Sequence, residues 1–374
     1  MFRIASTLLF IIILNTSLQG CASLSFYSQA IVGHTSLLWQ RKDIAQILAD
    51  PATDETTRAK LQLVNNVLRY AEDNLKLPVG DSYSTYVATG KPFIVWNVFA
   101  APELSLEMKS FCYPIAGCVS YRGYFKERQA VKMAAVLQDD GYDVFVGGVA
   151  AYSTLGWFSD PVLDTFLNRS DVSLARLLFH ELAHKAVYIK GDTQFNESFA
   201  TAIEEAALKP WLDDRMEGQV YENYLERKAR RSQVLGIISD TRNALRVLYL
   251  GTLSPGEQLR EKQALIDVLR AEYRKLHDSW NGDNDFQYWM SSEITFSEIN
   301  NAKLGTIAEY NDWVPAFHTL LSEHGGDMSQ FIRAVDEISN LKKQARDKLL
   351  TEKMPGHLQE RHADSSHHNR SQEI

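Results

Sequence analysis

Apolar residues recur at helical spacing in two segments near the start of the chain. Residues 26–49 and residues 53–74 each fit an amphipathic helix, and Pro51 separates them. The apolar positions of the second segment that repeat at helical spacing are Leu61, Val64, Leu68 and Ala71. We therefore expect two consecutive helices here, followed by a polar loop over residues 78–91.

Two apolar runs after this loop predict buried strands. Residues 93–99 form the first run, and residues 143–152 form the second. Residues 121–125 are expected to form a turn that leads into a helix over residues 126–139. The strands and this helix predict a small sheet in the first half of the chain.

The rest of the chain has a strongly helical pattern. One helix is expected from Ser170 or Asp171 to Ile189, and a second from Asp192 or Thr193 to Lys209, before Pro210. Further helices are expected over residues 214–250, 256–277, 311–323 and 328–350. The long pair, 214–250 and 256–277, predicts an antiparallel hairpin.

These elements predict a helix-rich α+β fold. Residues 21–210 would form an α/β half that carries the candidate chemistry, and residues 211–350 a helical half that contains the hairpin. The active-site cleft is expected between the two halves. The polar residues 351–374 predict a disordered tail.

The N-terminal residues 1–20 have the pattern of an export signal. Arg3 precedes a short apolar run that is shorter than the ~20 residues of a membrane span. Residues 18–21 resemble a bacterial lipobox, in which Cys21 is lipidated, and Ala22 by resemblance favours the outer membrane of a Gram-negative cell. The expectation is a lipoprotein that faces the periplasm and contacts the membrane only through its lipid anchor. A plain secretory signal, which would give a soluble periplasmic protein, is the alternative.

The formal net charge of −8 argues against nucleic acid as a partner, because phosphate binding needs a basic face. The sequence also has no Gly-rich phosphate loop and no dinucleotide fingerprint. Cys112 and Cys118 are six residues apart, and in an oxidising periplasm a disulfide is the natural interpretation. Two reduced thiols are the alternative. The oligomeric state is left open.

One of the helices carries the pattern of a metal site. His180 and His184 are four residues apart, so both imidazoles lie on one helix face and can reach one metal ion. Neutral imidazole is a good zinc ligand, and a catalytic zinc site uses three protein ligands and leaves one position open. Glu181 follows the first histidine, where its carboxylate could serve as the general base.

A third ligand is available on the next helix. Glu197 lies thirteen residues after His184, and an antiparallel helix would bring its carboxylate beside the two imidazoles. A carboxylate favoured by the helix dipole is the simpler alternative. Together the three residues predict one zinc ion held by His180, His184 and Glu197.

The sequence His-Glu-Leu-Ala-His followed by Asn-Glu-x-x-Ala resembles the gluzincin metallopeptidases. Further matching stretches are residues 121–125, 151–157, 179–185, 195–200 and 300–302. With them the chain is similar, over residues 25–335, to a bacterial family of predicted aminopeptidases. The resemblance implies a support role for Asn196, which precedes the ligand. Glu204 is seven residues after Glu197, so it could receive a ligand histidine's free N–H, or lie at the surface. The spacing between His184 and Glu197 is shorter than in better-studied gluzincins, so the connection must be tight.

On the substrate side, the resemblance implies that a strand before the metal helix pairs with the peptide. The strand over residues 144–152, which ends at Tyr152, is the candidate; an interior strand is the alternative. Tyr310 is the first candidate for the oxyanion donor, with Tyr152 and Arg122 as competitors. The Gly-x-Met-Glu-Asn motif that binds the substrate amine in M1 aminopeptidases is absent.

The leading hypothesis is a zinc peptidase acting on peptides or proteins, expected to be an aminopeptidase. Hydrolysis of cell-wall peptides would use the same chemistry. A rival of a different class is a non-catalytic zinc-containing envelope scaffold or chaperone-like binding protein that uses the hairpin as its partner surface. Glu181 argues against this rival, because a structural zinc site needs no general base.

Overall fold

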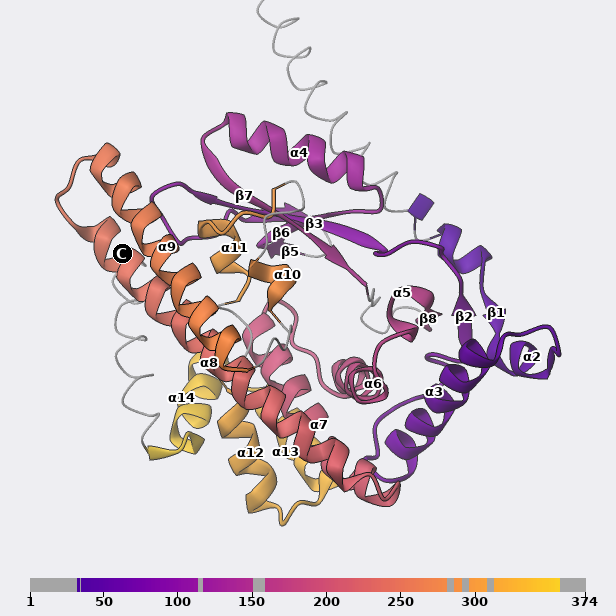
Figure 1. The fold of residues 1–374 in the computed structure, drawn as a ribbon. Coiled ribbons are helices and arrows are strands. Elements are labelled where there is room, and N and C mark those ends of the chain that lie inside the picture. Colours follow the sequence, from indigo (N-terminus) through magenta and orange to yellow (C-terminus); the bar gives the residue numbers. More distant parts are fainter. Residues whose placement is uncertain are drawn as a thin grey trace, which may run out of the picture.

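The computed structural model describes residues 32–33, 35–113, 117–150, 159–280, 286–290, 296–307 and 313–356. Within these residues the fold is a helix-rich α+β fold with small sheets, as expected from the sequence (Figure 1). Within the described residues, no helix is both long enough and apolar enough to cross a membrane. Residues 1–31 and 357–374, which hold the expected export signal, Cys21 and most of the expected tail, lie outside the described residues.

The central sheet has the strand order β6-β3-β7, and all its pairings are antiparallel. Its strands are β3 (Val95–Pro102), β6 (Tyr121–Tyr124) and β7 (Tyr142–Val149). Helix α4 (Glu127–Asp139) covers one face of this sheet (Figure 1). The residues buried between the helix and the sheet include Val98, Ala134 and Val146.

One strand of the central sheet was expected to be a turn. Residues 121–124 form β6, in which Tyr124 pairs with Trp96 and Tyr121 pairs with Phe99. Tyrosine suits an extended, half-buried surface, and the neighbouring strand supplies the hydrogen-bond partners that a local pattern cannot reveal. The turn prediction was therefore wrong, whereas the helix that follows was predicted within one residue.

A second small sheet joins the N-terminal segment to the middle of the chain. It contains β1 (Lys42–Asp43), β2 (Thr85–Val87) and β8 (Val162–Leu163). Beside it lie α2 (Ile44–Ala49), α3 (Glu55–Asp73) and α5 (Asp164–Leu167). The single helix expected over residues 26–49 is interrupted, because β1 pairs with β2 and the Asp43 side chain then caps α2.

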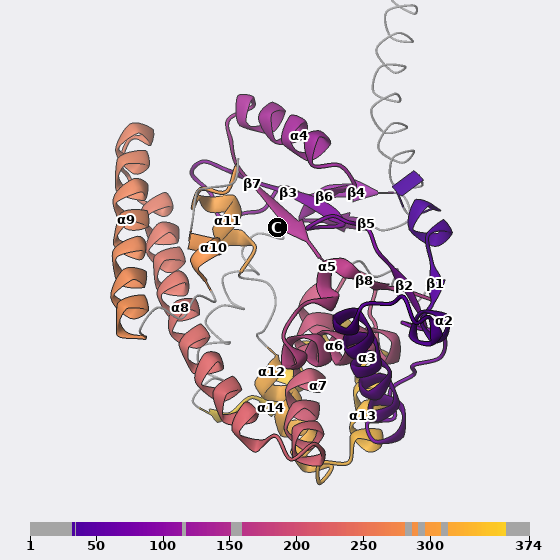
Figure 2. The ribbon, with the colours of Figure 1, turned by 45° about the vertical axis from the view of Figure 1, so that its right-hand side comes forward.

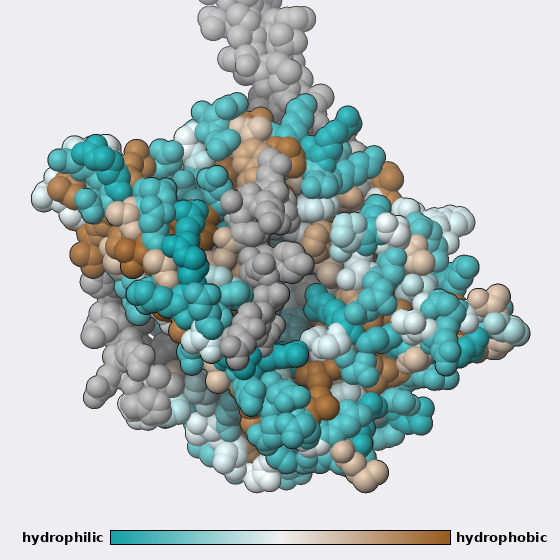
Figure 3. All heavy atoms as spheres, in the orientation of Figure 1, coloured by the Kyte–Doolittle hydropathy of each residue, from teal (hydrophilic) through white to brown (hydrophobic). Residues whose placement is uncertain are grey.

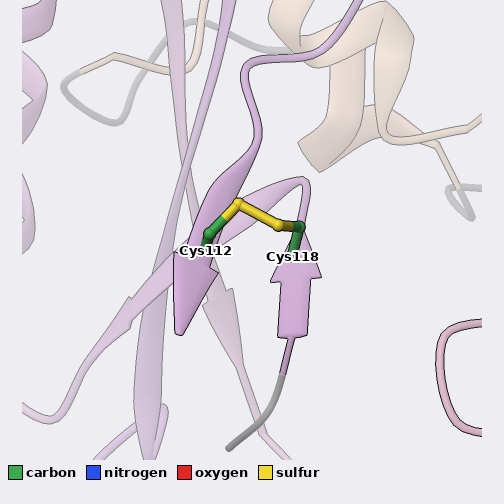
Figure 4. Close-up of a disulfide and its surroundings, with 2 residues drawn as sticks. All are labelled: Cys112 and Cys118. Carbon is green, nitrogen blue, oxygen red and sulfur yellow. A yellow bond between two sulfur atoms is a disulfide. The ribbon is translucent and has the colours of Figure 1, made fainter. Parts of the chain in front are cut away.

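The two cysteines of the middle segment form a disulfide. Strands β4 (Phe111–Tyr113) and β5 (Gly117–Val119) pair as a hairpin in which Cys112 lies opposite Cys118. Figure 4 shows the bond between the two side chains. The reduced alternative is therefore not what the structure contains.

Two packed helices, α6 (Asp171–Ala186) and α7 (Thr193–Asp214), form the middle of the molecule (Figure 1). Helix α7 was expected to stop before Pro210, but it continues to Asp214. An interior proline costs a helix about 3 kcal/mol. The extension buries Trp211 and Leu212, so tertiary packing offsets that cost.

The second half of the chain is helical, as predicted. Its elements are α8 (Gly218–Leu250), α9 (Pro255–Ser279), α10 (Gln287–Met290), α11 (Asn301–Gly305), α12 (Val314–Glu323), α13 (Met328–Ser339) and α14 (Lys343–Lys353). Helices α8 and α9 form the expected antiparallel hairpin (Figures 1 and 2). A capping box between Ser254 and Glu257 starts α9.

Two boundaries in this half differ from the sequence prediction. The helix expected over residues 328–350 is split into α13 and α14, because Ser339 and Asn340 both donate side-chain hydrogen bonds to the Asp336 carbonyl and end the last turn. The disordered tail was expected from residue 351. Instead, α14 continues to Lys353, and the Met354 side chain is buried in the core.

The largest hydrophobic core crosses the expected boundary at residue 210. It includes Leu61 of α3 and Phe179 of α6, together with Phe317 of α12 and Phe331 of α13. A separate core lies between α8, α9 and α11 and includes Val234, Leu269 and Leu304. Helices α6 and α7 lie in the first of these cores, where α3 packs on α6 and α12 packs on α7.

Candidate metal centre

Helix α6 presents the two histidines from one face. Ser170 caps the helix by accepting a hydrogen bond from the Ser173 N–H. The opposite face is packed into the core and includes Leu174, Leu178 and Leu182. Because that apolar face fixes the rotation of the helix, His180 and His184 project toward Glu197 of α7, and His180 and Glu181 line a neighbouring cavity.

Asn196 holds the short connection between α6 and α7. Its Oδ1 accepts a hydrogen bond from the Ile189 N–H, and its Nδ2 donates to the Ile189 carbonyl, both at 2.8 Å. Gly191 has a φ of +83°, a conformation that favours glycine. Asp192 then caps α7 and pairs with the buried Arg346. These contacts explain how a connection as tight as the sequence implied brings Glu197 back to the histidines.

The structure brings the three expected ligands together. The Nε2 atoms of His180 and His184 are 3.2 Å apart. Oε2 of Glu197 lies 3.2 Å from Nε2 of His180, and its Oε1 lies 3.6 Å from Nε2 of His184. Three donor groups from two helices therefore converge on one point.

Electrostatics distinguish the two imidazoles. Burial lowers the pKa of His184 to about 4, helped by the nearby His180. Burial alone would also lower the pKa of His180, but its hydrogen bond to Glu197 and the surrounding carboxylates outweigh this and raise it. Burial likewise opposes ionisation of Glu197, but the hydrogen bond and the two imidazoles lower its pKa. At neutral pH the cluster offers a neutral His184 and an ionised Glu197.

Glu204 lies where the sequence placed it, on the ligand side of α7. Its Oε2 is 3.8 Å from Nδ1 of His180, the ring nitrogen that faces away from Glu197. Its Oε1 accepts a 2.6 Å ion pair from Arg176, whose guanidinium lies 4.9 Å from the ring centroid of Tyr224. Glu204 is 9% exposed, so it is not the surface residue of the alternative interpretation.

Glu181 lies beside the cluster and lines the cavity. The charge of Glu181 affects the pKa of three neighbours. It contributes to the raised pKa of His180, and it adds to the larger effect of burial that raises the pKa of Tyr83. Burial lowers the pKa of Arg169, and the charge of Glu181 opposes this shift. The carboxylate is thus close to the first histidine but is not one of the three converging donors.

Two tyrosines that the sequence analysis did not single out lie near the ligands. The Tyr188 ring is 6.2 Å from that of His184, and the side chain is 44% exposed. Burial raises the pKa of Tyr188, and Glu197 adds to the shift. Burial also raises the pKa of Tyr121 on β6, with Tyr188 and Glu197 contributing. Helix α6 ends at Ala186 and Val187 is extended, so helical spacing from His184 could not have pointed to Tyr188.

Other expected site residues lie elsewhere. Tyr310 and Tyr152 are outside the described residues, so their predicted roles stay predictions. Strand β7 is an edge strand in the described strand order, but part of its outer edge is already hydrogen-bonded to other segments of the chain. The Val146 N–H donates to the Phe296 carbonyl, and Asn300 donates to the Val144 carbonyl. The competing candidate Arg122 lies on β6, 5.7 Å from the ring centroid of Tyr124.

A cavity of about 2000 Å³ opens beside His180 and Glu181. Helices α6 and α7 form one side of it, and α8 and α12 from the helical half form another. Its lining therefore comes from residues on both sides of position 210. The volume is large enough for several residues of a peptide.

The comparison with protein families gives one finding. A family model described as "Putative aminopeptidase" matches residues 25–350, a range that contains all three converging ligands and nearly all of the cavity lining. Neither the curated proteins nor the solved structures contain a match to this chain. The chain therefore belongs to the Putative aminopeptidase family, whose description indicates a hydrolase that acts on peptides.

Proposed function

We propose that the protein is a zinc-dependent peptidase in which His180, His184 and Glu197 hold one zinc ion. The convergence of the donor groups carries this proposal: the two Nε2 atoms are 3.2 Å apart, Oε2 of Glu197 is 3.2 Å from Nε2 of His180, and Oε1 of Glu197 is 3.6 Å from Nε2 of His184. Tetrahedral zinc with ligand bonds of ~2.0–2.1 Å places neighbouring ligand atoms about 3.3 Å apart. Two histidines and one carboxylate fit the donor set of a catalytic zinc site with a free fourth position, as in gluzincins.

The surrounding residues have separate roles in this proposal. When bound, zinc would lower the pKa of a water molecule and polarise the scissile carbonyl. Glu181 accepts the proton of the attacking water and passes it to the leaving amine. Glu204 faces the second nitrogen of His180 and orients that ring, while Arg176 holds Glu204 in place. Tyr188, exposed beside His184, is a described candidate for stabilising the oxyanion, and Tyr310 is the candidate from the sequence.

The finer assignments rest on the sequence and the family. Aminopeptidase action is the expected form of the activity, because the family is described by it. We also propose that the protein is a bacterial lipoprotein, anchored through Cys21 to the periplasmic side of the outer membrane. The disulfide between Cys112 and Cys118 supports an oxidising compartment.

Comparison of the wild-type protein with Glu181→Gln tests the mechanism. Both proteins would be assayed on a library of unmodified peptides by mass spectrometry, and zinc would be measured in both by atomic emission. Because Glu181 is the base and not a ligand, we expect equal zinc content and a fall in kcat/KM of at least about a hundredfold in Glu181→Gln. Glu197→Ala is the matched ligand variant, and it should lose most of its zinc as well as its activity.

Two results would count against the proposal. Zinc bound to both proteins without any cleavage would favour the non-catalytic zinc scaffold. Full zinc occupancy in Glu197→Ala would remove Glu197 from the ligand set.

A further inference from the structure

The carboxylates that line the cavity beside His180, apart from the proposed base Glu181, are already neutralised. Within the described lining, each of them lies within ion-pair distance of a cation: Asp171 with Lys60 at 2.6 Å, Glu204 with Arg176 at 2.6 Å, Glu205 with Lys228 at 2.8 Å, Glu217 with Arg215 at 2.8 Å, and Glu323 with Lys353 at 2.6 Å. Binding a substrate ammonium here would require one of these pairs to break. The described lining therefore does not suit the amino end of a peptide.

Two cations of the same lining have no such ion pair within the described residues, in contrast to Arg176 and Lys228. Arg227 and Arg169 line the cavity, and neither has a carboxylate within 4.0 Å among the described residues. Arg227 is exposed on α8, one turn after Tyr224 and on the same helix face. Since Tyr224 packs against Arg176, and Arg176 holds Glu204 beside His180, a chain of contacts links this part of α8 to the metal centre.

The length of the cavity along α6 can be estimated from Arg169 and His180, which both line it. Arg169 is eleven residues before His180, which corresponds to roughly 16 Å along a helix. An extended peptide rises ~3.3 Å per residue, so about five residues would cover this distance, and fewer once the arginine side chain reaches inward. A short peptide can thus extend from Glu181 to Arg169 within a cavity that Arg227 also lines.

We propose that this cavity binds the carboxyl-side part of a peptide and that Arg227, assisted by Arg169, anchors a carboxylate of that peptide. A guanidinium binds a carboxylate through two parallel hydrogen bonds, so it selects this group with defined geometry. The carboxylate is either the free C-terminus of a short peptide or an acidic side chain. This inference rests on the proposed peptidase function, because it takes the cleaved bond to lie at Glu181.

The test measures binding and cleavage separately. Binding is measured by calorimetry in the zinc-loaded Glu181→Gln background with three probes: an alanine pentapeptide with a free C-terminus, its C-terminal amide, and the amide with Glu as its fourth residue. Arg227→Gln is added to this background and compared with Arg246→Gln. Arg246 is on the same helix, pairs with Asn243 and does not line the cavity. The same arginine variants are assayed for kcat/KM in the wild-type background.

Arg227→Gln should weaken binding of at least one carboxylate probe by about tenfold while the simple amide is unaffected, because a charge-assisted pair is lost. Arg246→Gln should change none of the three. Loss for the free acid alone assigns the site to the C-terminus, and loss for the Glu-containing amide alone assigns it to an acidic side chain. Equal affinities of all probes for Arg227→Gln and its parent, or no measurable binding of the carboxylate probes, would overturn the inference. Arg227-dependent binding without cleavage by the wild-type protein would instead contradict the peptidase function and leave the carboxylate site standing.

Discussion

His180 and His184 are one helical turn apart, yet their surroundings shift the two pKa values in opposite directions. Burial and the neighbouring His180 hold the pKa of His184 near 4, so this ring is neutral and ready to bind a metal. Burial also acts against the charge on His180, but the hydrogen bond to Glu197 and the nearby carboxylates raise its pKa. Without a bound cation, a proton on His180 neutralises part of the negative charge of the neighbouring carboxylates, a role that we assign to zinc.

Zinc binding should therefore release a proton near neutral pH. Imidazole must be neutral to bind a metal, and the raised pKa means that His180 retains its proton to a higher pH than an ordinary histidine. The apparent affinity for zinc should fall as the pH is lowered through this pKa. Calorimetric titration of the metal-free protein at about pH 6.5, in two buffers with different protonation enthalpies, counts the protons.

Glu204→Gln is the control for this titration. It removes one of the carboxylates that raise the pKa of His180 and keeps the shape of the side chain, so fewer protons should be released at the same pH. Equal proton release by both proteins would contradict the contribution of Glu204 to the raised pKa of His180. No proton release by the wild type would contradict the raised pKa itself.

The grouping of His180 with His184 could be predicted from sequence because their relation is local, whereas Glu197 lies on the next helix. A spacing of four residues determines which helix face both histidines share, and the spacing of seven residues after Glu197 placed Glu204 on the correct face. Tyr121 belongs to a strand of the central sheet, and only tertiary structure brings it within range of Glu197. The charge balance of the cavity depends on ion pairs between helices distant in sequence, so no spacing rule could reveal that Arg227 has no carboxylate partner among the described residues.

At the scale of elements, a buried polar network fastens the α8–α9 hairpin to the central sheet. Lys262 of α9 pairs with Asp143 at the start of β7 at 2.6 Å, and Asp143 also accepts from the Asn301 N–H. The Asn301 side chain donates to the Pro102 carbonyl and accepts from the Tyr249 hydroxyl. The Asn300-Asn301-Ala302 sequence, part of the family resemblance, thus has an architectural role that residue identity alone did not reveal.

Breaking this network should destabilise the fold. The side chains of Lys262 and Asp143 are 9% and 12% exposed, so Lys262→Ala leaves a buried carboxylate without its cation. We expect a loss of about 3 kcal/mol in the free energy of unfolding, measured by urea denaturation. Lys209→Ala, which removes an exposed pair with Asp213, should have little effect. Equal effects of the two substitutions would show that the hairpin is not held by this pair.

The pattern of apolar residues predicted which segments are helical more reliably than it predicted where each helix ends. The α8–α9 hairpin was predicted within a few residues, because its apolar repeats are long and its turn has a strong capping sequence. The prediction ended one helix too early, at Pro210, and carried another too far, through residues 339–340. The burial of Trp211 extended one helix, whereas side-chain hydrogen bonds to the Asp336 carbonyl ended another.

At the scale of the whole molecule, most of the surface seen in Figure 3 is hydrophilic, and hydrophobic residues also occur on the side of the hairpin. The exposed apolar side chains of the hairpin include Val247, Leu250 and Val268. The proposed attachment to a membrane does not depend on them, because it is assigned to a lipid on Cys21.

Lipid labelling in cells that produce the full chain tests this attachment. In cells supplied with radioactive palmitate, the wild-type protein should incorporate the label and Cys21→Ser should not, because it has no thiol to lipidate. Cys112→Ser is the matched cysteine control, since it removes the disulfide and leaves the anchor. Label that is still incorporated into Cys21→Ser would contradict a lipid anchor at this residue.

We propose one zinc ion between α6 and α7, and a crystal of the zinc-loaded protein measured on both sides of the zinc absorption edge locates it. One strong anomalous peak is expected within about 2.0–2.2 Å of Nε2 of His180, Nε2 of His184 and a carboxylate oxygen of Glu197. A crystal with no peak there, or with its zinc on other residues, would contradict this proposal.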